Sequence, residues 1–133
     1  MAKSGPTIYV VDDDASVRRA LSRLLKSAGF QVETFISAQE FLDSGQTEVP
    51  GLLVLDVRLP GLSGLDLQKV LSASVSRLPI IFITAFDSDQ ERAQGLSAGA
   101  LAYLRKPFQE HQLLEAIEAG LRHAERASEW QDG

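Results

Sequence analysis

Short apolar runs and longer amphipathic segments alternate along this chain from one end to the other. Runs of consecutive apolar residues are typical of strands that are buried on both faces of a parallel sheet. Between these runs, apolar residues recur at three- and four-residue spacing, which is typical of helices with one buried face. The expected strands are 7–11, 32–35, 52–55, 80–83 and 102–104. The pattern therefore predicts an α/β fold in which five strands alternate with five helices and helices cover both faces of the sheet.

Capping and turn residues set the expected limits of the helices. We expect Asp14 or Ser16 to cap the first helix, Ser37 the second, and the segment 87–89 the fourth. The expected helices are 17–28, 38–43, 65–71, 90–97 and a last helix with Leu113, Leu114, Ile117 and Leu121 on one face. Gly29 and Gly99 should follow the first and fourth helices. The fourth helix is poor in large apolar residues, so we expect it to be the least firmly docked.

Composition narrows the class of protein further. A chain of 133 residues suits one domain with a single sizeable core. Its net charge of -5 argues against a nucleic-acid surface, which needs concentrated Lys and Arg. The absence of cysteine excludes disulfides and thiolate metal sites. No apolar stretch approaches the roughly 20 residues that span a bilayer, so we expect no membrane contact and a cytoplasmic protein.

Reactive side chains follow the predicted strands at the points where the strands end. Asp12–Asp14 follow the first strand, Asp56 the third, Thr84 the fourth, and Arg105–Lys106 the fifth. In an open parallel sheet these ends meet at one edge, where ligands bind. Carboxylates about 4 Å apart repel each other by about 4 kcal/mol at an effective dielectric constant near 20. The sequence therefore predicts a site for a divalent cation beside a nucleophile.

Four short motifs occur in a fixed order along the chain. They are Val10-Val11-Asp12-Asp13, Leu55-Asp56 with Pro60 and Gly64 following, Thr84-Ala85, and Lys106-Pro107-Phe108. Together they resemble the receiver domain of bacterial two-component response regulators. The resemblance implies a doubly wound, flavodoxin-like and CheY-like (βα)5 fold with the sheet order 2-1-3-4-5. It covers about residues 7–123, so we expect 1–123 to form the receiver domain and 124–133 a C-terminal tail, which either extends the last helix or is a linker stub.

The resemblance implies that Asp56 is the phosphoacceptor, because a carboxylate can attack phosphorus and form an acyl phosphate. It also implies that Asp12 and Asp13 hold Mg²⁺ together with Asp56, the backbone carbonyl of Arg58 and water molecules. For Asp14 we favour a helix cap over a metal ligand. Taken alone, the adjacent acids at 12 and 13 are also compatible with a solvated loop or a cap.

Further residues acquire roles from the same resemblance. Thr84 is expected to donate its hydroxyl to a phosphoryl oxygen, with the Ala85 backbone N–H beside it. Lys106 is expected to pair with Asp56 at rest and with the phosphoryl group afterwards. The Lys106–Pro107 peptide bond is implied to be cis. Tyr103 is expected to be a switch residue that swings inward as Thr84 moves, although a half-buried ring with its hydroxyl in water is the alternative.

The last candidate residues are two positions that vary among receiver domains and the basic residues of the first helix. We expect Arg58 and Phe86 to line the entrance that attacking water uses, and Phe86 to slow loss of the phosphoryl group. The alternative for Phe86 is an exposed loop aromatic. The first helix carries Arg18, Arg19, Arg23 and Lys26. These residues form either a docking surface for the phosphodonor kinase or simply a solvated polar face.

The predicted function is that of a signalling domain and not of an enzyme that turns over an external substrate. A sensor histidine kinase would transfer a phosphoryl group from its phosphohistidine to Asp56. Phosphorylation would then reshape the surface formed by the fourth helix, fifth strand and fifth helix, through which a homodimer could form. The segment 56–64 most resembles FixJ- and NarL-type regulators, whose receivers usually precede a DNA-binding domain. The output would therefore be transcription, through DNA contacts made by a domain outside this chain.

Two other functions fit parts of the pattern. Aspartyl-phosphate phosphatases of the dehalogenase type use an Asp-x-Asp motif after the first strand, and Asp12–Asp14 contain that spacing. A second pair of carboxylates near the last strands, which these enzymes use, is missing. A flavodoxin-like nucleotide-binding module needs a phosphate-binding loop after the first strand. Here three carboxylates in that position would repel a phosphate.

Overall fold

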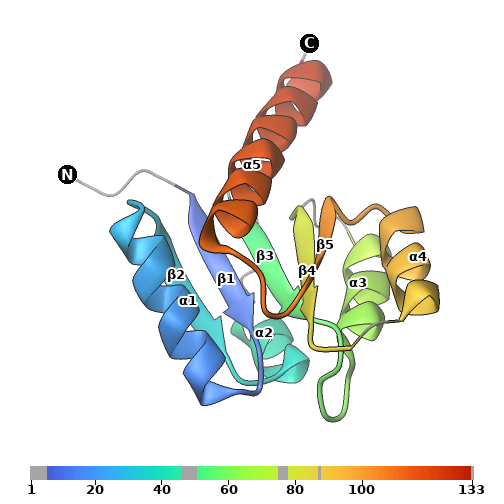
Figure 1. The fold of residues 1–133 in the computed structure, drawn as a ribbon. Helices are drawn as coiled ribbons and strands as arrows, with labels where there is room; N and C mark the ends of the chain where they lie inside the picture. The colour runs from blue at the N-terminus through green and yellow to red at the C-terminus, as the bar shows by residue number, and fades with distance from the viewer. Residues whose placement is uncertain (1–5, 46–50, 75–77, 87, 133) are drawn as a thin grey trace.

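Strands and helices alternate strictly along the chain in a computed structural model (Figure 1). The structure describes residues 6–45, 51–74, 78–86 and 88–132, and of residues 123–132 it describes the backbone only. The strands are β1 (Thr7–Val11), β2 (Gln31–Phe35), β3 (Gly51–Asp56), β4 (Ile80–Thr84) and β5 (Ala102–Arg105). The helices are α1 (Ala15–Ser27), α2 (Ala38–Ser44), α3 (Gly64–Ser72), α4 (Asp89–Ser97) and α5 (Glu110–Asp132). The alternation that the sequence predicts is therefore confirmed.

The strands form one parallel sheet in the order β2-β1-β3-β4-β5, which confirms the predicted topology. β1 lies between β2 and β3, so that Val11 is opposite both Phe35 and Leu55. At the far side, Thr84 of β4 is opposite Arg105 of β5. Because all strands run in the same direction, the residues that follow β1, β3, β4 and β5 meet at one edge of the sheet.

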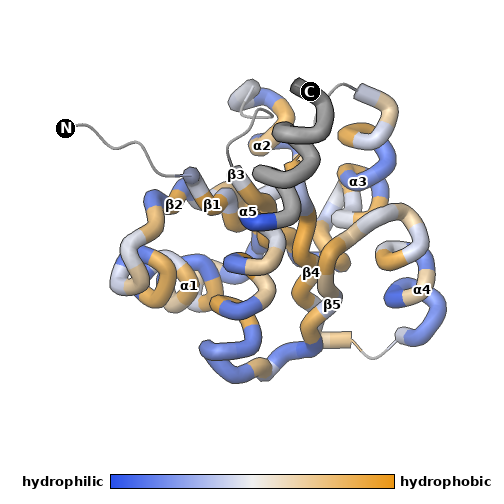
Figure 2. The backbone as a smooth tube through the Cα atoms, turned by 90° about the horizontal axis from the view of Figure 1, so that it is seen from above, coloured by the Kyte–Doolittle hydropathy of each residue, from blue (hydrophilic) through white to orange (hydrophobic). Residues whose placement is uncertain are grey.

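Helices cover both faces of the sheet and enclose a core on each side (Figures 1 and 2). Ile8 and Val10 of β1 point into the core beneath α1 and α5. Tyr9 and Val11 point into the opposite core, which α2 and α3 cover. All residues of β3 and β4 are buried, whereas the edge strands β2 and β5 are partly exposed. The continuous apolar runs thus lie at the centre of the sheet, as their sequence predicts.

Side-chain caps define where several helices begin. The expected caps are observed at Asp14 of α1, Ser37 of α2 and Ser88 of α4. Asp87, which belongs to the predicted cap of α4, lies outside the described residues. α3 begins with a capping box that the sequence interpretation did not include, in which Ser63 and Asp66 each bond the backbone N–H of the other. Asp14 thus serves as a cap, as expected.

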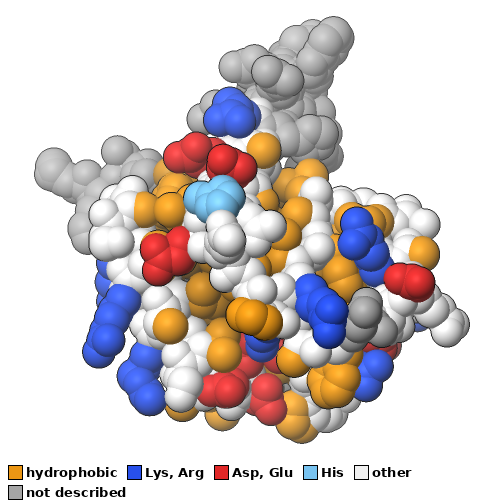
Figure 3. Space-filling model, in the orientation of Figure 1, with side chains coloured by type: hydrophobic (Ala, Val, Ile, Leu, Met, Phe, Trp, Pro, Cys, Tyr) orange, Lys and Arg blue, Asp and Glu red, His pale blue; other side chains and the backbone are white. Residues whose placement is uncertain are grey.

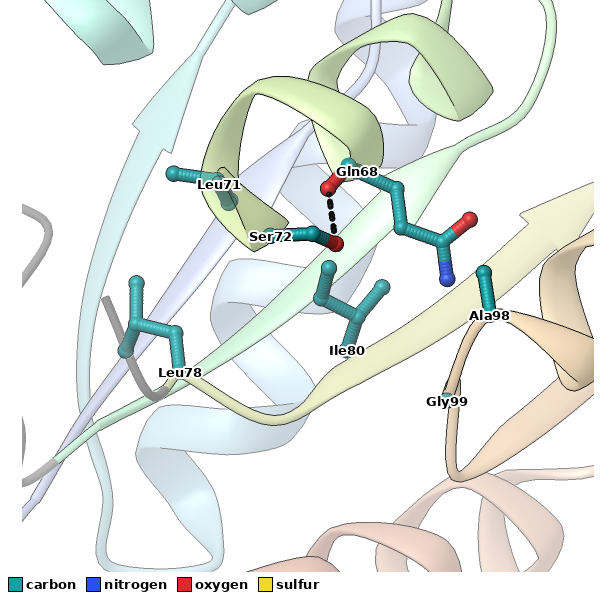
Figure 4. A pocket seen from close by; sticks show the side chains of 7 residues that line it. All are labelled: Gln68, Leu71, Ser72, Leu78, Ile80, Ala98 and Gly99. Carbon is teal, nitrogen blue, oxygen red and sulfur yellow. Dashed lines mark hydrogen bonds between the residues drawn. The ribbon is translucent and has the colours of Figure 1, made fainter. Parts of the chain in front are cut away.

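α4 rests on the sheet with little apolar contact, in agreement with its composition. Of its nine residues, Gly95 is the buried one. A Cβ atom at Gly95 would lie 2.9 Å from the Phe82 ring, so only glycine allows α4 to approach β4 this closely. The buried Gln68 side chain of α3 donates a hydrogen bond of 3.0 Å from Nε2 to the Gly95 carbonyl oxygen. Gln68 also lines a cavity of about 90 Å³ between α3 and the end of α4 (Figure 4).

α5 continues from Glu110 to Asp132 and projects beyond the sheet (Figure 1). The sequence left the segment 124–133 open between an extension of the last helix and a linker stub, and the backbone continues the helix through residue 132. Within the described parts of the chain, no helix is both long enough and apolar enough to cross a bilayer.

Candidate functional site

A pocket of about 460 Å³ opens at the carboxyl ends of β1, β3 and β4. Acidic side chains gather at this end of the molecule, along the lower edge of the space-filling view (Figure 3). The lining residues are Asp12, Asp13, Asp14, Asp56, Arg58, Leu59, Pro60, Ala85, Phe86 and Lys106. Of the site residues predicted from the sequence, Thr84 and Tyr103 do not line the pocket. The sheet topology therefore brings most of the predicted site residues into one pocket.

Three carboxylates in this pocket lie close enough to share one cation. One carboxylate oxygen from each of Asp12, Asp13 and Asp56 lies within 4.8 Å of the others. Asp12 is fully buried, Asp56 is 6% exposed and Asp13 is exposed, so the group lies between the sheet and solvent. Mg²⁺ prefers oxygen ligands and keeps several water molecules. The donor set therefore fits the magnesium site that the resemblance implies.

The Lys106 ammonium group contacts two of these carboxylates. Its Nζ donates to Asp12 Oδ2 at 2.8 Å and lies 3.6 Å from Asp56 Oδ2. The shorter contact is with Asp12, a partner that the sequence interpretation did not assign. Burial alone lowers the pKa of Lys106, but the hydrogen bond to Asp12 and the charge of Asp56 raise this pKa above its ordinary value. Lys106 is therefore held in its charged form, and its peptide bond to Pro107 is cis, as the resemblance implies.

The Asp56 carboxyl group lies where its negative charge is unfavourable. Burial, followed by the charge of Asp12, raises the pKa of Asp56 to about 6, although Lys106 and the Arg58 backbone N–H act in the opposite direction. The Arg58 N–H donates to Asp56 Oδ1 at 3.3 Å. At neutral pH the carboxyl group is therefore mainly ionised but poorly stabilised. Such a group gains from a neighbouring cation and can act as a nucleophile.

The backbone around Asp56 leaves no room for a side chain at Gly64, the first residue of α3. A Cβ atom at Gly64 would collide with the Asp56 backbone carbonyl oxygen. The Gly64 N–H also donates to the Val57 carbonyl oxygen at 2.9 Å. Glycine at this position therefore lets α3 begin directly against the backbone of Asp56 and Val57, which gives a physical reason for its place in the sequence motif.

Thr84 lies buried behind the pocket at the end of β4. Its hydroxyl oxygen accepts a hydrogen bond of 3.1 Å from the Phe86 backbone N–H. Its carbonyl oxygen accepts from the Lys106 backbone N–H at 2.6 Å, which ties the end of β4 to the residue after β5. Ala85 follows Thr84 and lines the pocket. The hydroxyl is thus bonded to the backbone here, one residue away from the pocket wall.

A stacked pair covers one side of the pocket. The Arg58 guanidinium carbon lies 4.1 Å from the centroid of the Phe86 ring, and Phe86 is 48% exposed. Both residues line the pocket, as the sequence predicts. Arg58 Nε also lies 3.3 Å from Glu91 Oε1 in the first turn of α4. Glu91 was missed in the sequence because it is 33 residues from Arg58 and no local pattern links the two.

Tyr103 lies half-buried on β5 with its ring against that of Phe82, at 6.0 Å between centroids. Its hydroxyl oxygen is buried and has no hydrogen-bond partner among the described residues. The alternative in which this hydroxyl lies in water is therefore wrong. Burial, and then the charge of Glu91, raise the pKa of Tyr103. A buried hydroxyl without a partner is uncommon and calls for an explanation.

A second, mostly apolar hollow lies beside the first. It has a volume of about 330 Å³ and lies between α1 and the segment after the cis peptide bond. Its lining residues are Val17, Ala20, Leu21, Leu24, Lys106, Pro107, Phe108 and Glu110. Of the four basic residues of α1, Arg18 is tied inward, since its Nη1 donates to the Asp12 carbonyl oxygen at 2.6 Å. Arg19 and Arg23 are exposed on α1 and do not line this hollow.

Comparison with known proteins agrees with the resemblance that the sequence motifs carry. The family model of the response regulator receiver domain matches residues 8–118. The chain is similar to "Transcriptional regulatory protein TdiR" of Thauera aromatica, with 46% identity over 115 residues, which cover 86% of this chain and 51% of that protein. It is also similar to "Transcriptional regulatory protein FixJ" of Bradyrhizobium diazoefficiens, with 42% identity over 121 residues, which cover 91% of this chain and 59% of that protein.

Solved structures of similar fold include the response regulator StyR and FixJ-N. StyR has a TM-score of 0.87 and 48% identity, and the match covers 97% of this chain and 67% of that one. FixJ-N has a TM-score of 0.83 and 33% identity, and the match covers 91% of this chain and 97% of that one. The chain spans about half the length of the curated relatives that it matches.

Proposed function

Because this chain belongs to the response regulator receiver family, we propose that it is the phosphoacceptor of a two-component system, with Asp56 as the residue that is phosphorylated. The observation that carries this proposal is the meeting of three carboxylates and one ammonium group in a single pocket. Asp56 lines this pocket, and burial together with the charge of Asp12 raises its pKa.

The chemical step is a direct displacement at phosphorus. An Asp56 carboxylate oxygen forms a bond to phosphorus while the bond from phosphorus to a histidine nitrogen of the kinase breaks. The electron pair of that bond stays on the nitrogen, and the product on Asp56 is an acyl phosphate. The negative charge then lies on the phosphoryl group, so the mobile Lys106 ammonium group can leave Asp56 and bind a phosphoryl oxygen. Attack of water on the acyl phosphate later restores the carboxylate and releases inorganic phosphate.

Asp12, Asp13 and Asp56 would hold Mg²⁺, together with the Arg58 backbone carbonyl and water. When bound, the ion offsets repulsion among the carboxylates and neutralises charge on the transferring phosphoryl group. This assignment rests on the close approach of three carboxylates, two of which are buried. Removal of the ion by a chelator should therefore abolish labelling of Asp56.

Thr84 and Tyr103 would carry the signal away from the pocket. The Thr84 hydroxyl would exchange its bond from the Phe86 N–H for a bond to a phosphoryl oxygen, with the Ala85 N–H donating beside it. Movement of Thr84 leaves space behind it, and Tyr103 would move further into that space. The surface that changes is formed by α4, β5 and α5. This is also the surface through which a homodimer would form.

The partners follow from the family and from the surface beside the pocket. A sensor histidine kinase would dock on α1, through the apolar hollow and through the exposed Arg19 and Arg23 of the same helix. The two curated relatives described above are named as transcriptional regulators. Because this chain covers only about half of each, the output is proposed to be transcription in the cytoplasm, through DNA contacts of a separate domain.

The decisive experiment is labelling with acetyl phosphate and Mg²⁺, followed by intact mass measurement. We expect the mass of one phosphoryl group on the wild-type protein and none on Asp56→Asn. Asp43→Asn, an exposed acid on α2, serves as the matched control and should be labelled like the wild type. Labelling of Asp56→Asn would contradict the assignment of the nucleophile. Continuous release of phosphate from a phosphate ester, without stable labelling, would instead favour the phosphatase alternative.

A further inference from the structure

One ion pair joins α4 to the rim of the Asp56 pocket. Arg58, two residues after Asp56, places its Nε 3.3 Å from Glu91 Oε1 in the first turn of α4. The same guanidinium group lies over the Phe86 ring, with 4.1 Å from its carbon to the ring centroid. The described residues provide α4 with few other anchors, since Gly95 is its buried residue and Gln68 supplies a single hydrogen bond. This ion pair is therefore a substantial part of what holds the beginning of α4.

Arg58 is placed so that it can reach a second partner. Its side chain is 47% exposed and lines the same pocket as Asp56. Its backbone N–H already donates to Asp56 Oδ1 at 3.3 Å, so the side chain starts beside the nucleophile. A phosphoryl group carries up to two negative charges and three acceptor oxygens, and a guanidinium group binds it with two parallel hydrogen bonds. A phosphorylated Asp56 therefore competes with Glu91 for Arg58.

The buried Tyr103 hydroxyl of β5 lies within the electrostatic influence of this ion pair. It lacks a hydrogen-bond partner among the described residues. The charges that act on it are those of Glu91, Arg58, Arg92 and Asp56, with Glu91 the strongest. While Arg58 pairs with Glu91, the carboxylate faces the guanidinium group. Once Arg58 leaves, the Glu91 carboxylate loses its ion-pair partner, and its charge acts on Tyr103 without that offset.

We propose that Arg58 changes partner when Asp56 is phosphorylated, so that its guanidinium group leaves Glu91 and binds the phosphoryl oxygens. The first turn of α4 thereby loses its ion pair with Arg58. This inference rests on the proposed phosphorylation of Asp56. It assigns to Arg58 a binding role for the phosphoryl group and to Glu91 the role of its resting partner.

The test compares Glu91→Gln with Asp89→Asn. Both variants remove one acidic charge from the first turn of α4, but the ion pair of Arg58 is with Glu91. Hydrogen exchange of the 89–97 backbone amides is followed by mass spectrometry. In the unphosphorylated state, we expect exchange in Glu91→Gln to be about two- to fivefold faster than in the wild type, the range for a partly exposed ion pair. Asp89→Asn loses only a charge at the helix N-terminus, so its exchange should rise less than that of Glu91→Gln.

The second half of the test adds Mg²⁺ and acetyl phosphate, with intact mass as a separate readout of labelling. Phosphorylation should speed α4 exchange in the wild type and in Asp89→Asn, but should add little in Glu91→Gln or in Arg58→Gln. Equal resting exchange in all variants, or an equal increase on phosphorylation, would overturn the partner change while leaving the phosphorylated Asp56 intact. Absence of the phosphoryl mass on the wild-type protein would instead overturn the proposed function, and this inference with it.

Discussion

At the scale of single residues, the charge of Asp56 sets the behaviour of the pocket. Its pKa rises from 3.8 to about 6 because of burial and the neighbouring Asp12 charge. A folded-state pKa above the unfolded value means that this group contributes its full stability below about pH 4. That contribution is lost as the pH rises through about 6, since the buried group must then ionise. The pocket thus stores unfavourable electrostatic energy at neutral pH.

Replacement of Asp56 by Asn should release this energy. In metal-free buffer at pH 7 to 8, we expect the free energy of unfolding of Asp56→Asn to exceed that of the wild type by about 1–3 kcal/mol. The difference should shrink toward pH 4, where the wild-type carboxyl group is protonated, and urea unfolding at several pH values measures it. Mg²⁺ should also narrow the gap at neutral pH, because the ion stabilises only the folded wild type. A difference that is the same at every pH would contradict the raised pKa.

Phe86 covers the pocket beside Arg58, which predicts an effect on the lifetime of the acyl phosphate. Removal of the ring in Phe86→Ala should open the path for attacking water and speed loss of the phosphoryl group by about two- to tenfold, equivalent to at most about 1.4 kcal/mol. The half-life of the label, measured after removal of the phosphodonor, reports this rate. Val70→Ala removes an exposed apolar side chain outside the pocket and serves as the control. An unchanged half-life in Phe86→Ala would rule out the shielding role.

At the scale of the elements, the helices differ in how they are held. α1 and α5 bury leucine and isoleucine side chains in the core, whereas α4 buries a glycine. A helix that lacks an apolar face depends on polar contacts, which can be exchanged at low cost. The sequence predicted this weakness from composition alone. The structure adds the two contacts that compensate for it, from Gln68 of α3 and from Arg58.

Loss of the Gln68 contact should loosen α4 selectively. Gln68→Leu keeps much of the side-chain volume but removes the hydrogen bond to the Gly95 carbonyl oxygen. We expect the free energy of unfolding to fall by about 0.5–1.5 kcal/mol, because the Gly95 oxygen keeps its bond from the Ala100 N–H. Backbone amides of α4 should exchange faster, while those of β1 and β3 follow global stability. Gln94→Leu, the same change at an exposed position of α4, should leave both measurements close to the wild type.

At the scale of the whole molecule, charge is distributed unevenly. The chain carries a net charge of -5, and acidic residues dominate the pocket. Exposed Arg19 and Arg23 lie on α1, the helix that also lines the apolar hollow. An acidic pocket with a basic neighbour can orient a partner that carries both a negative surface and a phosphoryl group. The proposed histidine kinase would be such a partner.

Charge reversal on α1 should therefore slow phosphorylation by the kinase without affecting phosphorylation by acetyl phosphate. In Arg19→Glu/Arg23→Glu, transfer from the phosphorylated kinase should slow by about tenfold or more at low salt, whereas labelling by acetyl phosphate should not change. Rates of label appearance with each donor provide the measurement, and raising the salt concentration should reduce the difference. Lys69→Glu, an exposed reversal on α3, is the control. Equal slowing with both donors would mean that the arginines act on the pocket and not on docking.

The architecture was predictable because it depends on local patterns. Apolar runs that end in Asp12, Asp56 and Thr84 are readable in one dimension, and parallel strands place their ends together. The alternation of strands with helices, the caps at Asp14 and Ser88, and the weak docking of α4 follow from the same reasoning. The meeting of the carboxylates in one pocket is a consequence of the topology.

The tertiary structure alone decided which side chains pair with one another. The main partner of Lys106 is Asp12, Arg18 bonds a backbone carbonyl, and Arg58 reaches α4. Each of these contacts depends on rotamers and on how closely helices approach the sheet. Neither quantity follows from hydrophobic spacing, which only specifies which face of an element is buried. The sequence by itself therefore determined where the reactive groups meet, and the packed structure decided how their charges are shared.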